Sequence, residues 1–191
     1  MTSKTDAGAA QMDPRDEIVT HLKPMRAFAL SLTRDVARAD DLVQDTVVKA
    51  WTNIDKFAVG TNMRAWLFTI LRNTFYSERR KAKREVADVD GAMTERMSEK
   101  PAHDGRLALT DFRRAFDQLP AEQREALILV GAQGFAYEEA AQMCGCAVGT
   151  VKSRANRGRK RLAEMLNMQE DEAMELTDQA TVAVISRNPT M

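Results

Sequence analysis

The stretch from Lys152 to Arg161 holds six lysine or arginine residues and no acidic residue. Small and apolar residues recur through it and its flanks at steps of three and four, so a helix here would bury one face and leave the other basic. The inward positions are Val148, Val151, Ala155, Gly158 and Leu162, and the outward ones are Lys152, Ser153, Asn156, Arg157, Arg159 and Lys160, with Arg154 at the flank. Lysine and arginine bind phosphates and guanines, while serine and asparagine can meet base edges, so this face offers the chemistry of binding duplex DNA in the major groove. The competing interpretation is a solvated basic helix on an ordinary bundle.

A turn must position this helix, and the residues before it predict one. Gly145 is placed for the left-handed turn that ends a short helix starting after Phe135-Ala136. Ala141 supplies a small residue where two helices would cross, and Val151 supplies an apolar anchor for the second helix. Residues 137–162 therefore predict a helix-turn-helix, which favours DNA binding over the solvated helix.

Other reactive residue types are scarce. His21 and His103 are the only histidines, and neither lies near a plausible nucleophile or metal cluster. Cys144 and Cys146 are the only cysteines; a disulfide at that spacing would be strained, and two thiols are too few for a structural zinc site. We expect no enzyme, no metal site and no cofactor, with the cysteines serving as small packing residues.

The charges are segregated along the chain of 191 residues, although its formal net charge is zero. Residues 72–84 carry six basic residues against one acid, whereas residues 85–104 and 164–178 each carry six acids. Two basic patches are the footprint of two surfaces that meet a polyanion. No apolar run approaches the roughly 18 residues of a membrane span, and the first 15 residues lack a signal-peptide core, so a cytoplasmic protein without membrane contact is expected.

The apolar periodicity predicts an all-α protein, because nothing alternates with period two over a useful length. Asp13 and Pro14 are typical of a helix start; a second helix fits Ala39 to about Ile54, and Thr61 or Asn62 can cap a third after Gly60. The expected inward residues of these helices are Ile18, Leu22, Met25, Ala29 and Leu32; Leu42, Val43, Val47, Ala50 and Trp51; and Met63, Trp66, Leu67, Ile70 and Leu71.

We expect two small helical domains joined by a flexible acidic linker. The first spans residues 13–85 and the second residues 106–166, with the linker at 86–105. In the second domain one helix begins near Arg106, Pro120 opens the next, and that helix ends near Gly134. Residues 1–12 and the acidic tail 167–191 are expected to be disordered, although residues 170–176 could extend the last helix.

Three segments of the chain resemble bacterial RNA polymerase sigma factors of the extracytoplasmic-function (ECF) type. They are ADDLVQDTVVKAWTNIDKF, GTNMRAWLFTILRN and the block from Leu119 to Leu162. RNTFYSERRKAKREVAD and LPAEQREALILVGAQGFAYEEAAQMCGCAVGTVKSR resemble the EcfG subgroup, which directs the general stress response in alphaproteobacteria. The resemblance covers about residues 13–166 and implies sigma region 2 in the first domain and sigma region 4 in the second. It also implies a promoter-specificity subunit, monomeric when free, that confers no catalysis of its own.

The resemblance implies that the second helix docks on the clamp helices of the largest subunit of core RNA polymerase. The matching residues are Asp40, Asp41, Leu42, Gln44, Asp45 and Lys49. An acidic face meeting a basic coiled coil is the functional reading. The alternative is that acids in the first turn of this helix suit the helix dipole, and both can hold.

The third helix and the loop after it would open and read the minus-ten promoter element. Asn73 closes the apolar helix, and the resemblance implies that it lines a pocket for a base flipped out of the non-template strand, unless it is a helix-capping amide. An aromatic can stack on an unpaired base, and basic residues can hold the backbone. The implied set is Asn73, Thr74, Phe75, Tyr76, Arg79, Arg80, Lys81 and Lys83.

The basic helix of the second domain would read the minus-thirty-five element as duplex. The implied contacts are Lys152, Ser153, Arg154, Asn156 and Arg157, with Arg159 and Arg161 nearer phosphates. The resemblance also implies an anti-sigma partner of the NepR type. Two alternatives stay open: a sigma-like decoy that binds the anti-sigma protein instead of DNA, and a helix-turn-helix regulator that is not a sigma factor.

Overall fold

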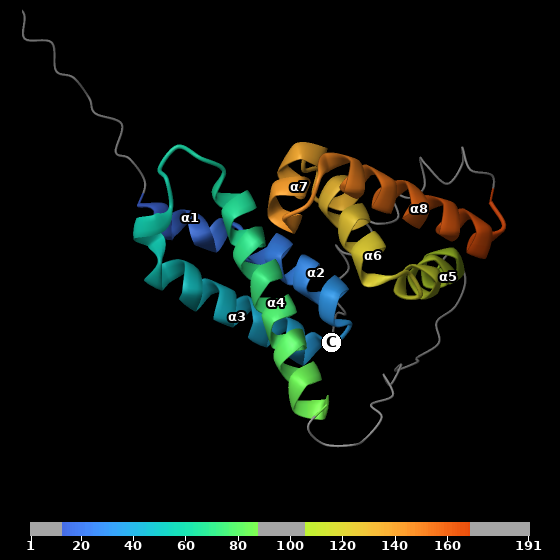
Figure 1. Cartoon of the computed structure of the whole chain (residues 1–191), viewed down its shortest axis with the longest axis horizontal. Helices are drawn as coiled ribbons and strands as arrows, with labels where there is room; N and C mark the ends of the chain where they lie inside the picture. The colour runs from blue at the N-terminus through green and yellow to red at the C-terminus, as the bar shows by residue number, and fades with distance from the viewer. Residues whose placement is uncertain (1–12, 88–105, 169–191) are drawn as a thin grey trace, which may run out of the picture.

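The computed structural model describes residues 13–87 and 106–168 (Figure 1), and within these ranges all regular structure is helical, as expected. The first domain comprises α1 (Pro14–Thr20), α2 (Leu22–Thr33), α3 (Val36–Thr52), the short 3-10 helix η1 (Ile54–Lys56) and α4 (Met63–Ala87). The second comprises α5 (Arg106–Asp117), α6 (Ala121–Leu127), the π-helical segment η2 (Ile128–Ala132), α7 (Tyr137–Cys144) and α8 (Val148–Leu166). The expectations for residues 1–12, 88–105 and 169–191 lie outside the described residues.

The first amphipathic stretch forms two helices, where the sequence predicted one. The start is as expected, because the Asp13 side chain accepts a hydrogen bond from the Arg15 backbone N–H. The break falls at His21, between α1 and α2. Pro24 accounts for it: a proline has no N–H to donate, and its ring crowds the carbonyl four residues earlier, here that of Thr20.

Helix α3 starts three residues earlier than expected, with Asp35 as its N-cap. Asp40 and Asp41 therefore lie beyond its first turn, so the helix dipole does not account for them, and that alternative was wrong. The expectation that Trp51 lies in the core was also wrong, since Trp51 is 51% exposed. The buried stripe runs through Ala39, Leu42, Thr46 and Ala50, which turns the next residue outward.

Helix α4 runs without a break from Met63 to Ala87 and has no loop after Asn73. It begins as expected: the Asn62 side chain accepts a hydrogen bond from the Ala65 backbone N–H at 3.1 Å. Because the helix continues for more than three turns beyond it, Asn73 neither ends nor caps a helix, and both expectations were wrong. The basic residues after Asn73 are thereby held on a rigid rod.

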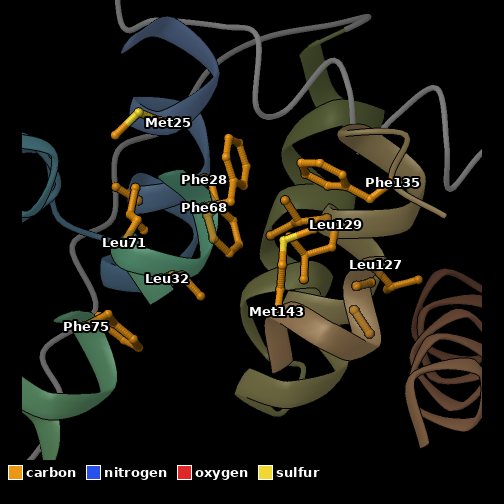
Figure 2. Packing of buried hydrophobic residues seen from close by; sticks show 14 of the residues in the cluster. Met25, Phe28, Leu32, Phe68, Leu71, Phe75, Leu127, Leu129, Phe135 and Met143 are labelled. Atoms are coloured by element: carbon orange, nitrogen blue, oxygen red, sulfur yellow. The ribbon is translucent and has the colours of Figure 1, made fainter. Parts of the chain in front are cut away.

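The two domains pack directly on each other, with α4 against α7 and α2 against α6. Phe68 of α4 stacks on Phe28 of α2, with ring centroids 5.0 Å apart, and meets the edge of Phe135 of the second domain at 5.2 Å. Figure 2 shows Phe28 and Phe68 facing Phe135, Leu129 and Met143 across this boundary. One aromatic side chain therefore belongs both to the core of the first domain and to the contact between domains.

Gly158 lies where α8 crosses α6, which gives it a role beyond its low helix propensity. A Cβ at this position would come within 2.9 Å of Leu127 Cδ1, on a side chain that is fully buried. Glycine inside a helix costs about 1 kcal/mol relative to alanine. Here that cost is offset because the absent Cβ lets α8 pack closely on α6. This packing sets the distance between the basic helix and the rest of its domain.

Candidate nucleic-acid interface

The helix-turn-helix forms as its residues predicted. Gly145 adopts φ 61° and ψ 39°, in the left-handed region, and ends α7. Val151 is fully buried and Ala141 is 4% exposed, so the anchor and the helix crossing are as expected. The N-terminus of α7 is closed by Glu139, whose Oε2 accepts a hydrogen bond from the Ala136 backbone N–H. These contacts fix the orientation of α8 relative to α7.

Helix α8 buries the predicted inward residues at its centre and leaves a basic face to solvent. Val151, Ala155, Gly158 and Leu162 are buried. Lys152, Asn156, Arg157 and Arg161 are exposed, whereas Ser153, Arg154 and Arg159 are half-buried. Arg157 folds back on its own helix, where its Nη2 donates to Ser153 Oγ at 3.1 Å. This arginine must release an intrahelical contact before it can reach DNA.

The residues expected to form a base pocket on α4 do not lie together. Asn73 is exposed, but Thr74 and Phe75 are buried at 4% and 9% exposure and face the core of the first domain. Tyr76 is half-buried, and its hydroxyl donates to Glu125 of the second domain. Arg79, Arg80, Lys81 and Lys83 are all exposed further along the helix. The Asn73 amide and the basic stretch are therefore accessible to DNA, whereas the two aromatic side chains are engaged in contacts within the protein.

Of the residues expected to dock on the polymerase, all except Leu42 are exposed. Asp41, Gln44 and Asp45 are exposed, and Lys49 is exposed while its Nζ donates to Thr74 Oγ1 at 3.1 Å. Asp40 pairs with Arg26 of α2, and this guanidinium lowers the pKa of the Asp40 carboxyl below its ordinary value. Leu42 is 2% exposed, so the expectation that it contacts a partner was wrong: it packs in the core.

The sequence matches two protein families in the order of its domains: Sigma-70 region 2 over residues 18–85 and Sigma-70, region 4 over residues 109–162. It is 54% identical to the ECF RNA polymerase sigma factor EcfG of Rhodopseudomonas palustris, over 80% of this chain and 84% of the relative. The chain is an ECF RNA polymerase sigma factor. It is a transcription initiation factor and not an enzyme.

Two further comparisons agree with this assignment. SigM of Bacillus subtilis, also an ECF sigma factor, is 32% identical over 80% of this chain and 94% of its own length. The solved structure of the sigma factor RpoE from Bartonella quintana, in complex with the anti-sigma factor NepR, matches with a TM-score of 0.71 and 54% identity over 80% of this chain and 96% of that one.

A polar cluster between the two domains of the sigma factor was not predicted from the sequence. Glu125 of α6 is fully buried and pairs with Arg72 of α4, whose Nε donates to Oε1 at 2.7 Å. Burial raises the pKa of the Glu125 carboxyl, while Arg72 opposes that rise. The only local signal is that Glu125 directly precedes the apolar run Ala126–Val130. This predicts a buried acid that needs a partner, but it does not predict which residue the partner is.

The described parts of the sigma factor offer no site for a metal ion. No group of three or more histidine, cysteine or acidic side chains gathers in residues 13–87 and 106–168. No helix in these ranges is long and apolar enough to cross a membrane.

The Cys144 thiol is expected to react slowly. Burial raises the pKa of the Cys144 thiol to about 12, so its thiolate is scarce at neutral pH. In a Cys146→Ser variant, the remaining Cys144 should react with iodoacetamide roughly a hundredfold or more slowly than an unperturbed thiol. Alkylation rates followed by mass spectrometry measure this, and urea should abolish the difference. Equally fast alkylation in native protein and in urea would contradict it.

Proposed function

We propose that this sigma factor acts in the cytoplasm, where it binds core RNA polymerase and directs it to promoters of general stress response genes. The basic face of α8 would bind the minus-thirty-five element as duplex. Asn73 and the basic stretch from Arg79 to Lys83 would bind the opened minus-ten strand, and the exposed acids of α3 would dock on the clamp helices of the polymerase. The protein would be monomeric when free.

The observation that carries this proposal is the presence of two exposed basic surfaces on two domains. One is a helix of a helix-turn-helix, whose shape fits a major groove. The other is the rod of α4, where an exposed amide and exposed cations lie along one helix. A single-element DNA binder would need only the first surface, whereas a promoter with two elements requires both.

Reconstituted transcription tests the proposal directly. Core RNA polymerase should initiate at specific sites on a promoter library only when this protein is added, and the starts should share two sequence elements. Unchanged initiation upon addition would contradict the function as a sigma factor. Specific starts that share one element alone would contradict the assignment of one of the two surfaces.

An anti-sigma partner of the NepR type is part of the proposal. It is supported by the 54% identity with the RpoE chain that was solved in complex with NepR. A NepR-type protein should form a 1:1 complex with this chain in solution and suppress the reconstituted transcription. Complex formation by a chain that does not support reconstituted transcription would instead indicate a decoy.

Replacement of Asn73 with alanine should impair promoter opening more than polymerase binding. Asn73 is exposed on α4, so the change leaves the core intact, and a lost hydrogen bond to a base edge reduces opening by about tenfold. Permanganate footprinting measures opening, and a fluorescence titration measures polymerase affinity. Gln118→Ala, which removes an exposed amide in the second domain, is the control. Equal losses of opening and affinity would contradict the assignment.

A further inference from the structure

The cluster of Arg72, Tyr76 and Glu125 is the most deeply buried polar contact between the two domains. The Glu125 side chain is 0% exposed and that of Arg72 is 17% exposed. Arg72 Nε lies 2.7 Å from Oε1, and the Tyr76 hydroxyl donates to Oε2 at 3.3 Å. The Arg72 guanidinium also lies over the Tyr76 ring, 4.7 Å from its centroid. Both side chains shown to donate to this carboxylate come from α4 of the other domain.

Arg72 and Tyr76 lie on the same side of α4 as Arg79 and Lys83, two of the basic residues proposed to hold the opened strand. The positions 72, 76, 79 and 83 follow steps of four, three and four, which place their side chains along one stripe of a helix. Arg79 and Lys83 are exposed on this stripe. The N-terminal end of the stripe carries Arg72 and Tyr76. Arginine can hold a phosphate, and tyrosine can stack on an unpaired base. In the structure the two domains are in contact, an arrangement called closed below, and the Glu125 carboxylate covers that end of the stripe.

The closed arrangement cannot persist on a promoter. Elements centred at minus ten and minus thirty-five lie roughly 25 base pairs apart, which is ~85 Å of duplex at about 3.4 Å per base pair. In the structure α4 and α7 are in direct contact. The 18 residues between Ala87 and Arg106 can span at most roughly 65 Å when extended, which permits the two domains to separate. Engagement of both elements therefore breaks the cluster and leaves Arg72 and Tyr76 without their acidic partner.

We propose that Glu125 is an internal stand-in for a DNA phosphate: it covers Arg72 and Tyr76 while the chain is closed, and both side chains contact the opened strand once the domains part. The inference rests on the proposed function and adds Arg72 to the strand-binding residues. It makes opening and strand binding mutually dependent, because the same two side chains serve the domain contact or the DNA. Free protein would bind opened strand poorly, and protein held open by polymerase would bind it well.

Other polar contacts between the domains involve residues outside this stripe. Arg34 Nη1 donates to the Asp117 carbonyl at 3.2 Å, and further contacts lie near the start of α4. Asn62 donates to Glu139 Oε1 at 2.8 Å, and Arg64 pairs with Gln133. These residues lie two to three turns before Arg72, away from the stripe that continues to Lys83. They hold the domains together without covering the strand-binding stripe. Because the Glu125 contact also breaks when the domains part, a change there that opens the chain should unmask Arg72 and Tyr76 as well.

The test uses the full chain and a single-stranded oligonucleotide with the non-template sequence of the minus-ten region. Glu125→Gln keeps the shape and an acceptor oxygen but removes the charge that competes with phosphate. Loss of a charged hydrogen bond favours opening by roughly tenfold, so this variant should bind the oligonucleotide about tenfold more tightly and have a larger radius of gyration by X-ray scattering. Asp111→Asn, which neutralises an exposed acid of α5 in the same domain, should match the wild type. No gain in affinity with Glu125→Gln would overturn the proposal.

A second pair of variants separates opening from strand contact. In the Glu125→Gln background, Arg72→Ala should lose the gained affinity while the scattering stays that of an open chain. Retained affinity would show that Arg72 does not contact the strand and would overturn the proposal. Tyr76→Phe removes only the hydroxyl that donates to Glu125 and should open the chain partly. Circular dichroism of all variants checks that none of them has lost its helical fold. Reconstituted transcription by the wild type is independent of these outcomes, so a failure here is distinguishable from a failure of the proposed function.

Discussion

Replacement of Phe68 with alanine is expected to lower the free energy of unfolding by about 3–5 kcal/mol, which is the usual cost of removing a buried phenylalanine ring. Phe68 is fully buried, stacked on Phe28 and edge-on to Phe135 of the second domain. The cavity would thus remove contacts from the core of the first domain and from the contact between domains at once. No other aromatic residue in the described ranges has ring contacts in both domains.

Urea unfolding followed by circular dichroism measures the loss. Phe116 is the matched control, because it is fully buried but stacks only on Phe112 within the second domain. Both alanine variants should lose stability, but only Phe68→Ala should also enlarge the radius of gyration under native conditions. If the two variants show the same radius as the wild type, the ring does not contribute to domain closure.

Local signals in the sequence were sufficient to predict that the chain is helical and to place several of the helix ends. Asp13, Asn62 and Gly145 each act within a few residues of their own position, by capping or by a left-handed turn, and the structure confirms all three. The inward stripe of α8 was equally predictable, because a period of three to four residues is written in the sequence itself. The helix-turn-helix and its basic face follow from these features alone.

What the sequence could not predict depends on contacts between distant residues. Trp51 was expected in the core because it is large and apolar, but the small residue Ala50 takes the inward position and the tryptophan lies outside, beneath the Arg15 guanidinium. Asn73 is a different case, because the missed signal was local: the stretch from Glu78 onward is rich in good helix formers, and the helix continues for more than three turns beyond Asn73. The pairing of Glu125 with Arg72 spans 53 positions, and no local pattern links them.

These differences change the candidate site in one direction. The resemblance implied a base pocket lined by Asn73 and a DNA-binding set that continued through Thr74, Phe75 and Tyr76, but consecutive residues on a helix point about 100° apart. The structure therefore divides them between solvent, the core and the domain boundary. A continuous helix exposes a stripe instead of a pocket, and a stripe suits a strand that runs along α4.

Replacement of Arg157 with alanine should weaken binding to a minus-thirty-five duplex by about 1–3 kcal/mol and reduce the salt dependence of binding by about one counterion. Arg157 is exposed at the centre of the basic face, and its only contacts in the structure are with Ser153 on its own helix. The change should leave folding intact, since these contacts hold the side chain and not the helix. Each cation that meets a phosphate releases a counterion, so affinity and salt slope should fall together.

Fluorescence anisotropy with a labelled duplex at several salt concentrations measures both quantities. Arg38→Ala is the matched control, because Arg38 is an exposed arginine on α3 of the first domain and should not meet a minus-thirty-five duplex. Ser153→Ala adds a second check: it frees the Arg157 guanidinium from its hydrogen bond to Ser153 Oγ, so the variant should keep the full salt slope even if base recognition weakens. Loss of affinity without a change of slope would place Arg157 on a base edge. Unchanged affinity and slope would mean that the DNA meets another face of α8, and the assignment of the recognition surface would have to be rebuilt from that result.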